Sequence, residues 1–196
     1  MRDRDIRTAL REELKNAYRD DVGSMLIDEL GLCMGNARVD LAVVNGSLNG
    51  YEIKSERDTL QRLPHQVEIY GKALDYITIV ASSLHLEKII AMVPEWWGVT
   101  EAYSQDGGVR FRIVREPQTN PNVDPFSLVQ LLWREEALAL LKALGVEKGM
   151  MSKPRRAIWR KLAESKSIEE LGQLVRWQLK VRENWRSVPL PALSGD

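Results

Sequence analysis

Residues 38–54 read RVDLAVVNGSLNGYEIK, and this stretch decides the fold. Asp40 stands in one apolar run, a turn rich in asparagine and glycine follows, and the next apolar run contains Glu52 and Lys54. Because side chains alternate between the two faces of a strand, Glu52 and Lys54 should point to the same side. Ionisable groups among Val, Leu and Ile are costly to bury unless a partner compensates them. The stretch therefore predicts either a divalent-metal site or an ordinary ion pair on an exposed hairpin face.

The composition describes an ordinary globular chain. Its 196 residues, 44% hydrophobic and 29% charged, suit one sizeable domain with at most a small appendage. A single cysteine excludes an intramolecular disulfide, and two histidines leave few of the nitrogen and sulfur ligands that zinc prefers. No apolar run approaches the ~20 residues that a membrane helix requires, and the charged N-terminus does not read as a signal peptide. We therefore expect a cytoplasmic protein with no membrane partner.

A formal net charge of zero conceals an asymmetry along the chain. Residues 1–147 contain 17 Lys/Arg against 23 Asp/Glu, whereas residues 148–186 contain 11 Lys/Arg against four Asp/Glu. A basic segment of this kind can contact phosphates, and it is equally typical of a solvated helix face. Within it, Lys153, Arg155 and Arg156 open an expected helix, and helix N-termini favour phosphate. These three residues are the main nucleic-acid-binding candidates outside the hairpin.

The hydrophobic periodicity predicts an α/β protein with a mixed sheet. The expected helices cover residues 3–19, 63–75, 85–92, 126–144, 153–164 and 167–184. The expected strands cover residues 38–44, 50–55, 76–80, 98–104 and 109–114, while 22–32 reads either as a short strand or as an irregular lead-in. The order of two strands, a helix and another strand indicates a crossover on one face of the sheet.

The expected elements change from mixed strands and helices to helices alone, which suggests a domain organisation. Residues 1–116 form the expected core, and the proline-containing stretch 117–125 reads as a linker. Residues 126–186 form a basic helical appendage, and 187–196 read as a disordered tail.

Two further residues lie on the helix expected after the hairpin. Gln66 and Tyr70 are four positions apart, so both can face the strands that carry Glu52 and Lys54. Together with Asp40, this pattern resembles the PD-(D/E)XK nuclease superfamily, and the run after Gly50 is similar to small bacterial and prophage members. The resemblance covers about residues 3–81 and implies a restriction-endonuclease-like αβββαβ core.

The resemblance also implies an activity, which is Mg²⁺-dependent hydrolysis of phosphodiester bonds, most readily in DNA, with Mn²⁺ as an alternative metal. The metal would activate a water molecule and stabilise charge on the phosphate. The implied catalytic residues are Asp40, Glu52, Lys54, Gln66 and Tyr70, and the implied metal ligands are Asp40, Glu52 and the backbone carbonyl of Ile53. Lys54 would orient the water, since its compact ammonium suits that role.

Other positions complete the expected site. Glu29 is favoured as a further metal-site acid over Glu12 and Glu13, and it reads equally well as a surface acid. Arg57 and Arg62 are candidates for phosphate contact. Two alternatives remain beside the nuclease: a nucleic-acid-binding module that does not cleave, and an assembly module. The sequence also leaves a homodimer open.

Overall fold

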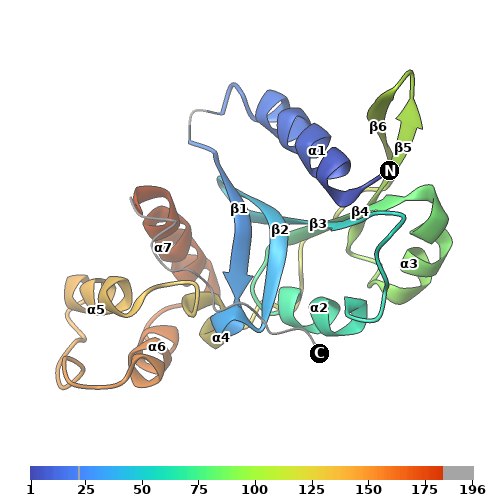
Figure 1. Cartoon of the computed structure of the whole chain (residues 1–196). Helices are drawn as coiled ribbons and strands as arrows, with labels where there is room; N and C mark the ends of the chain where they lie inside the picture. Colours follow the sequence, from blue (N-terminus) through green and yellow to red (C-terminus); the bar gives the residue numbers. More distant parts are fainter. Residues whose placement is uncertain (22, 183–196) are drawn as a thin grey trace.

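The computed structural model describes residues 1–21 and 23–182, which form six strands, seven α-helices and two short 3₁₀ helices (Figure 1). The strands are β1 (Met25–Leu32), β2 (Ala37–Val44), β3 (Leu48–Lys54), β4 (Tyr76–Ser82), β5 (Gly98–Gln105) and β6 (Gly108–Arg115). The α-helices are α1 (Asp3–Ala17), α2 (Leu63–Tyr70), α3 (Leu86–Met92), α4 (Pro125–Val129), α5 (Arg134–Ala143), α6 (Arg155–Ala163) and α7 (Ile168–Val181). The 3₁₀ helices are η1 (Cys33–Gly35) and η2 (Ser83–His85). The expected tail 187–196 lies outside the described residues.

The strands form one mixed sheet in the order β1-β2-β3-β4-β5-β6. The β3–β4 and β4–β5 pairs are parallel, and the other three pairs are antiparallel. The ambiguous segment 22–32 supplies the edge strand β1. The parallel pairs require crossovers, which α2 and α3 provide. The expected α/β class with a mixed sheet is confirmed.

The sheet lies between two unequal helical layers (Figure 1). On one face, Ile6, Leu10 and Leu14 of α1 pack on a small cluster that includes Leu41 and Ile53. The other face is covered by α2, α3 and the C-terminal helices, which share one large apolar cluster with the sheet. Burial of apolar surface on both faces is the main favourable contribution to such a fold. The helices on that second face deeply enclose the side of β3 that faces α2.

The proline-containing segment between β6 and α4 is fastened to the turn after α2. The side-chain amide of Asn120, which is buried, donates to the carbonyls of Gly71 at 2.8 Å and Leu74 at 2.7 Å. The backbone N–H of Asn120 donates to the carbonyl of Asp75 at 2.8 Å, and that of Asp124 to Lys72 at 2.9 Å. These bonds direct the chain toward α4 and hold the C-terminal helices against the sheet.

The expected helix 126–144 is wrong as a single element, because the chain forms two helices there, α4 and α5. Leu131 and Leu132 between them are both buried, and the Leu132 carbonyl accepts a hydrogen bond from the Trp159 indole at 3.1 Å. Trp133 has an extended backbone and caps α5, with its N–H donating to Glu136 Oε2 at 2.6 Å. Tertiary contacts therefore override a continuous helical pattern.

The expected helix 63–75 is also too long, since α2 ends at Tyr70 and a turn follows. Among the described helices, none is long and apolar enough to span a membrane.

Candidate functional site

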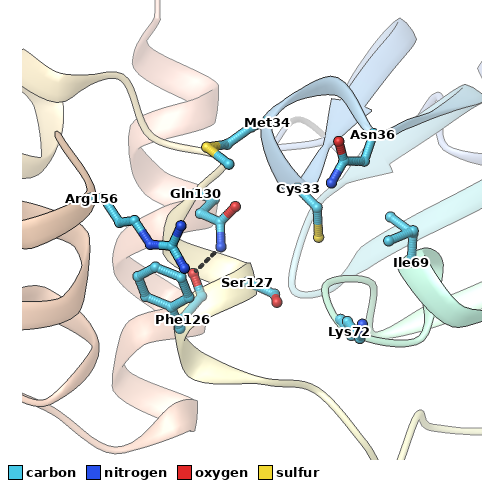
Figure 2. Close-up of a pocket in the computed structure, with 9 residues that line it drawn as sticks. All are labelled: Cys33, Met34, Asn36, Ile69, Lys72, Phe126, Ser127, Gln130 and Arg156. Carbon is cyan, nitrogen blue, oxygen red and sulfur yellow. Dashed lines mark hydrogen bonds between the residues drawn. The ribbon is translucent and has the colours of Figure 1, made fainter.

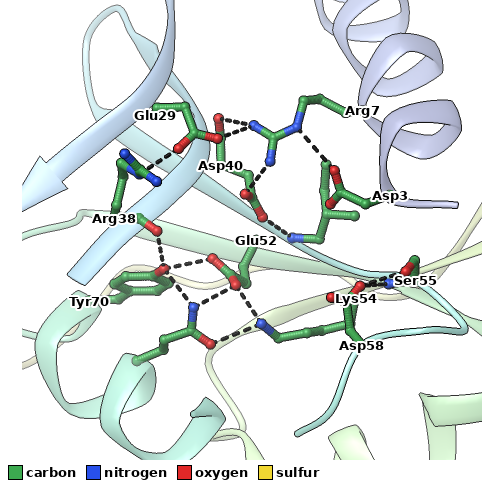
Figure 3. A network of polar contacts seen from close by, with 12 residues as sticks. Asp3, Arg7, Glu29, Arg38, Asp40, Glu52, Lys54, Ser55, Asp58 and Tyr70 are labelled. Atoms are coloured by element: carbon green, nitrogen blue, oxygen red, sulfur yellow. Dashed lines mark hydrogen bonds and ion pairs between the residues drawn. The ribbon is translucent and has the colours of Figure 1, made fainter. Parts of the chain in front are cut away.

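Glu52 and Lys54 lie on β3 near the middle of the sheet, on the face covered by α2 (Figure 3). Their residues are 3% and 4% exposed, so the pair is a buried one and not an ion pair on a hairpin surface. Lys54 Nζ donates to Glu52 Oε1 at 2.6 Å. A buried charge pair is tolerated only where the remaining donors and acceptors are also satisfied.

The helix α2 supplies those remaining partners. Gln66 Nε2 donates to Glu52 Oε1 at 2.6 Å, and Gln66 Oε1 accepts from Lys54 Nζ at 3.0 Å. Tyr70 Oη lies 2.6 Å from Glu52 Oε2 and 2.7 Å from the carbonyl of Arg38, and both oxygens can accept its one proton. Burial and the charge of Glu52 raise the pKa of the Tyr70 hydroxyl, so it stays a donor. We call Glu52, Lys54, Gln66 and Tyr70 the polar network.

Asp40 sits beside the polar network but is held by other groups. The β2–β3 pairing ends at Leu41 opposite Tyr51, and beyond it the Ile53 N–H donates to Asp40 Oδ2 at 2.7 Å. The carboxylate thus takes the place of a backbone acceptor from β2. Its other oxygen, Oδ1, accepts from Arg7 of α1 at 2.5 Å. Asp40 therefore links the two hairpin strands to α1.

Glu29 approaches Asp40 through an irregularity in β1. Glu29 has a φ of 58°, and the pair that it would form with Asp40 is missing from the β1–β2 ladder, although the register is the same on both sides of it. Glu29 accepts from Arg7 Nη1 at 2.6 Å and also pairs with Arg38. Arg7 thus links Glu29 to Asp40, and the role of Glu29 as a metal-site acid stays a prediction.

Arg7 is a central contact that was not expected from the sequence. It pairs with Asp3, Glu29 and Asp40 at once, and its side chain is one quarter exposed. A signal for it exists in the sequence, since Arg7 follows the buried Ile6 and stands four residues after Asp3. That position marks the edge of the buried face of α1.

The environment shifts the titration of Asp40. Burial, followed by the negative charge of Glu52, raises the pKa of the Asp40 carboxyl to about 6. The Ile53 N–H and the Arg7 guanidinium act in the opposite direction, because both favour the ionised form. The raised pKa means that the folded protein binds this proton more tightly than the unfolded chain does.

A pH-dependent stability follows from this shift. The stabilisation from protonated Asp40 should be complete below the unfolded pKa near 4 and lost as the pH rises through about 6. A shift of this size corresponds to about 2–3 kcal/mol. We expect urea unfolding between pH 4 and 7.5 to show that the free energy of unfolding of Asp40→Asn, relative to the wild type, increases by that amount as the pH rises. Parallel stability curves for the two proteins would contradict it.

The remaining predicted residues do not join this cluster. Arg57 and Arg62 are exposed in the loop between β3 and α2, and they have no ion pair with another described residue. Lys153, Arg155 and Arg156 lie at the start of α6, among the C-terminal helices (Figure 1). Arg155 Nη2 lies 3.9 Å from Met34 Sδ of η1, the turn that precedes β2.

The donor set around Asp40 and Glu52 does not fit a ready-made metal site. Each of the four carboxylate oxygens already accepts a hydrogen bond from a protein donor. Within residues 1–21 and 23–182, no group of three or more His, Cys, Asp or Glu residues is placed to hold a metal ion. Binding of Mg²⁺ or Mn²⁺ by Asp40, Glu52, Glu29 and the Ile53 carbonyl would require these hydrogen bonds to be exchanged for metal bonds, and it stays a prediction.

Comparison with known proteins gives a different relationship from the one expected. Residues 1–188 match the family described as bacteriophage P4 protein cII. The curated protein named "Protein cII" from Enterobacteria phage P4 is 28% identical over 183 residues, which cover 93% of this chain and 68% of that protein. No solved structure matches the chain. The expected link to phages is confirmed by these matches.

The same matches correct the expected activity. The resemblance to the PD-(D/E)XK superfamily covered about residues 3–81, whereas the phage family covers residues 1–188. The expected relationship to the PD-(D/E)XK nuclease superfamily is therefore wrong, and so is the expectation of a Mg²⁺-dependent nuclease and of a hydrolase more generally. The physical reason is that an acid-x-Lys strand facing a Gln-x-x-x-Tyr helix also forms a buried network whose members satisfy one another.

Proposed function

Because the chain belongs to the bacteriophage P4 protein cII family, we propose that it is a phage protein that acts by binding nucleic acid. We propose further that this nucleic acid is DNA. The contacts come from the basic face, which we define as Lys153, Arg155, Arg156, Arg160 and Lys161. The polar network has a supporting role, in which it locks α2 onto β3.

One observation carries this proposal: the cations of the basic face are not neutralised by the protein. All five residues are exposed, and none forms an ion pair with an acid in the described part of the chain. The sequence of α6 contains four cationic residues and no acidic one. In contrast, Arg7, Arg112 and Arg176 are each paired with a carboxylate.

The packing of α6 fixes where these charges point. Ile158, Trp159 and Leu162 are buried against the neighbouring helices, which leaves the charged side chains on the outer face. The Arg155 guanidinium lies 5.2 Å from the centre of the Trp159 ring, which restrains it through a cation–π contact. A rigid helix that presents unpaired cations suits the regular spacing of a phosphate backbone.

Replacement of four of these cations should abolish most of the binding. In the variant Lys153→Gln/Arg155→Gln/Arg160→Gln/Lys161→Gln, glutamine keeps a good helix propensity while it removes the charge. Fluorescence anisotropy with labelled duplex and single-stranded DNA should show at least about tenfold weaker binding near 100 mM salt. The slope of log K against log salt should also fall by about 0.9 for each duplex phosphate that the variant no longer neutralises.

The control carries the same change of net charge elsewhere on the surface. Arg4, Arg19, Lys88 and Lys142 are exposed, and their joint replacement by glutamine should leave affinity and salt slope close to the wild type. Equal losses of affinity in the two variants would mean that net charge alone attracts the DNA. Unchanged binding in the α6 variant would refute the basic face as the contact surface.

We also propose a specific architecture for the core of the chain. The order α1-β1-β2-β3-α2-β4 is the αβββαβ order of a restriction-endonuclease-like core, and it supports this architecture without the nuclease activity. An experimental structure superposed on solved members of that fold tests it.

A further inference from the structure

A pocket of about 290 Å³ lies where the sheet layer meets the C-terminal helices (Figure 2). Its walls come from η1 after β1, from the end of α2 with the turn that follows, and from α4 and α6. Its volume is close to the lower limit of roughly 300 Å³ for small-molecule sites, which suits a ligand of mononucleotide size. None of the residues predicted as the metal and catalytic site lines it.

The lining combines positive charge with hydrogen-bonding groups and has no acid among the described residues. Lys72 and Arg156 contribute the cations from opposite walls. The Arg156 guanidinium lies 5.9 Å from the centre of the Phe126 ring, which orients it. Lys72 pairs at 2.6 Å with Glu68, one turn earlier and exposed, so an anion in the pocket would compete only with a solvated partner.

The rest of the lining is divided between amide and apolar groups. Asn36 and Gln130 present side-chain amides, which can pair with the edge of a nucleobase. Ile69 and Phe126 provide apolar surface against which a flat ring can pack. Cys33 adds a buried thiol, and burial raises its pKa, so the thiol stays neutral beside an anion.

We propose that this pocket binds a nucleoside monophosphate group, with the phosphate held by Arg156 and Lys72 and the base packed among the amide and apolar groups of the lining. The group can be a free mononucleotide or the 5′-phosphorylated end of a nucleic-acid strand, because the two share this chemistry. The site is separate from the strand-backbone contacts proposed for the outer face of α6, and only Arg156 belongs to both.

Calorimetry with the full chain tests the proposal, with adenosine monophosphate, adenosine and inorganic phosphate as probes. Adenosine monophosphate should bind, and adenosine should bind at least about tenfold more weakly, because charge-assisted hydrogen bonds are the strong ones. Arg156→Gln and Lys72→Gln should each weaken binding of the monophosphate about tenfold. Lys148→Gln is the matched control, since Lys148 is exposed and does not line the pocket.

A second readout does not depend on binding heat. Cys33 is the chain's single cysteine and lines the pocket, so bound monophosphate should slow its reaction with a thiol reagent. No heat and no protection at millimolar monophosphate, or equal effects of Lys148→Gln and Lys72→Gln, would overturn the proposal. So would adenosine that binds as tightly as the monophosphate.

Two further experiments distinguish the possible sources of the ligand, and distinguish this proposal from the DNA-binding proposal. A 5′-phosphorylated oligonucleotide that displaces the monophosphate, when its 5′-hydroxyl counterpart does not, supports the strand end as the ligand. Binding of the free monophosphate alone supports the mononucleotide. The variant of Lys153, Arg155, Arg160 and Lys161 should keep monophosphate binding even where it loses DNA, so each proposal can fail without the other.

Discussion

Glu52→Ala is expected to lower the free energy of unfolding by about 3–5 kcal/mol, because it leaves Lys54 buried and charged without its partner. Lys54 is only 4% exposed, and its ammonium contacts Glu52 at 2.6 Å and Gln66 at 3.0 Å. The Tyr70 hydroxyl would keep only the Arg38 carbonyl as an acceptor. Urea unfolding monitored by tryptophan fluorescence measures the change.

The controls for this substitution are an exposed pair and a double replacement. Glu68 forms an exposed i,i+4 pair with Lys72 at 2.6 Å, so Glu68→Ala should cost less than about 1 kcal/mol. Glu52→Leu combined with Lys54→Met should recover much of the stability, since two apolar side chains replace a buried ion pair. A Glu52→Ala effect as small as that of Glu68→Ala would show that the polar network does not hold α2 to β3.

Trp159→Ala is expected to cost about 3–5 kcal/mol, the usual range for removal of a large buried aromatic side chain. Trp159 is 2% exposed, and its indole N–H donates to the Leu132 carbonyl at 3.1 Å, in the break between α4 and α5. The substitution therefore removes core packing and leaves that buried carbonyl without its donor. Thermal unfolding at constant pH measures the destabilisation.

Trp177 of α7 provides the matched control, because it is 56% exposed. Trp177→Ala should change the free energy of unfolding by less than about 1 kcal/mol, as surface substitutions generally do. If the two tryptophan variants were equally stable, α6 would not be packed as described, and the orientation of the basic face would lose its support.

The regular parts of the fold were predictable from sequence because their periodicity is strong. Val39 to Val44 and Tyr76 to Val80 read as buried strands, and Ile6, Leu10 and Leu14 mark one face of a helix. The break at 130–133 was not predictable, because its residues continue a helical pattern while distant residues bind its carbonyls, Trp159 at Leu132 and Arg182 at Leu131.

The sequence predicted which residues lie together in this site, and it did not predict what the cluster does. Strand alternation and helical spacing placed Glu52, Lys54, Gln66 and Tyr70 together, since both rules act over short distances. The contacts of Arg7 and the left-handed backbone at Glu29 depend on how α1 and β1 pack, which no local pattern records. A short motif gives residue types and spacing, and it does not say whether the carboxylates are free or already satisfied by neighbours.

We propose that the chain binds nucleic acid through the basic face, while the polar network stabilises the fold. The most direct measurement is an anisotropy titration of labelled DNA in Mg²⁺ with the wild type and the α6 glutamine variant, followed by sizing of the recovered strand. We expect tight, salt-dependent binding by the wild type, at least about tenfold weaker binding by the variant, and full-length DNA in both samples. Binding that survives the removal of the α6 cations, or Mg²⁺-dependent shortening of the strand that disappears in Lys54→Ala, would contradict it.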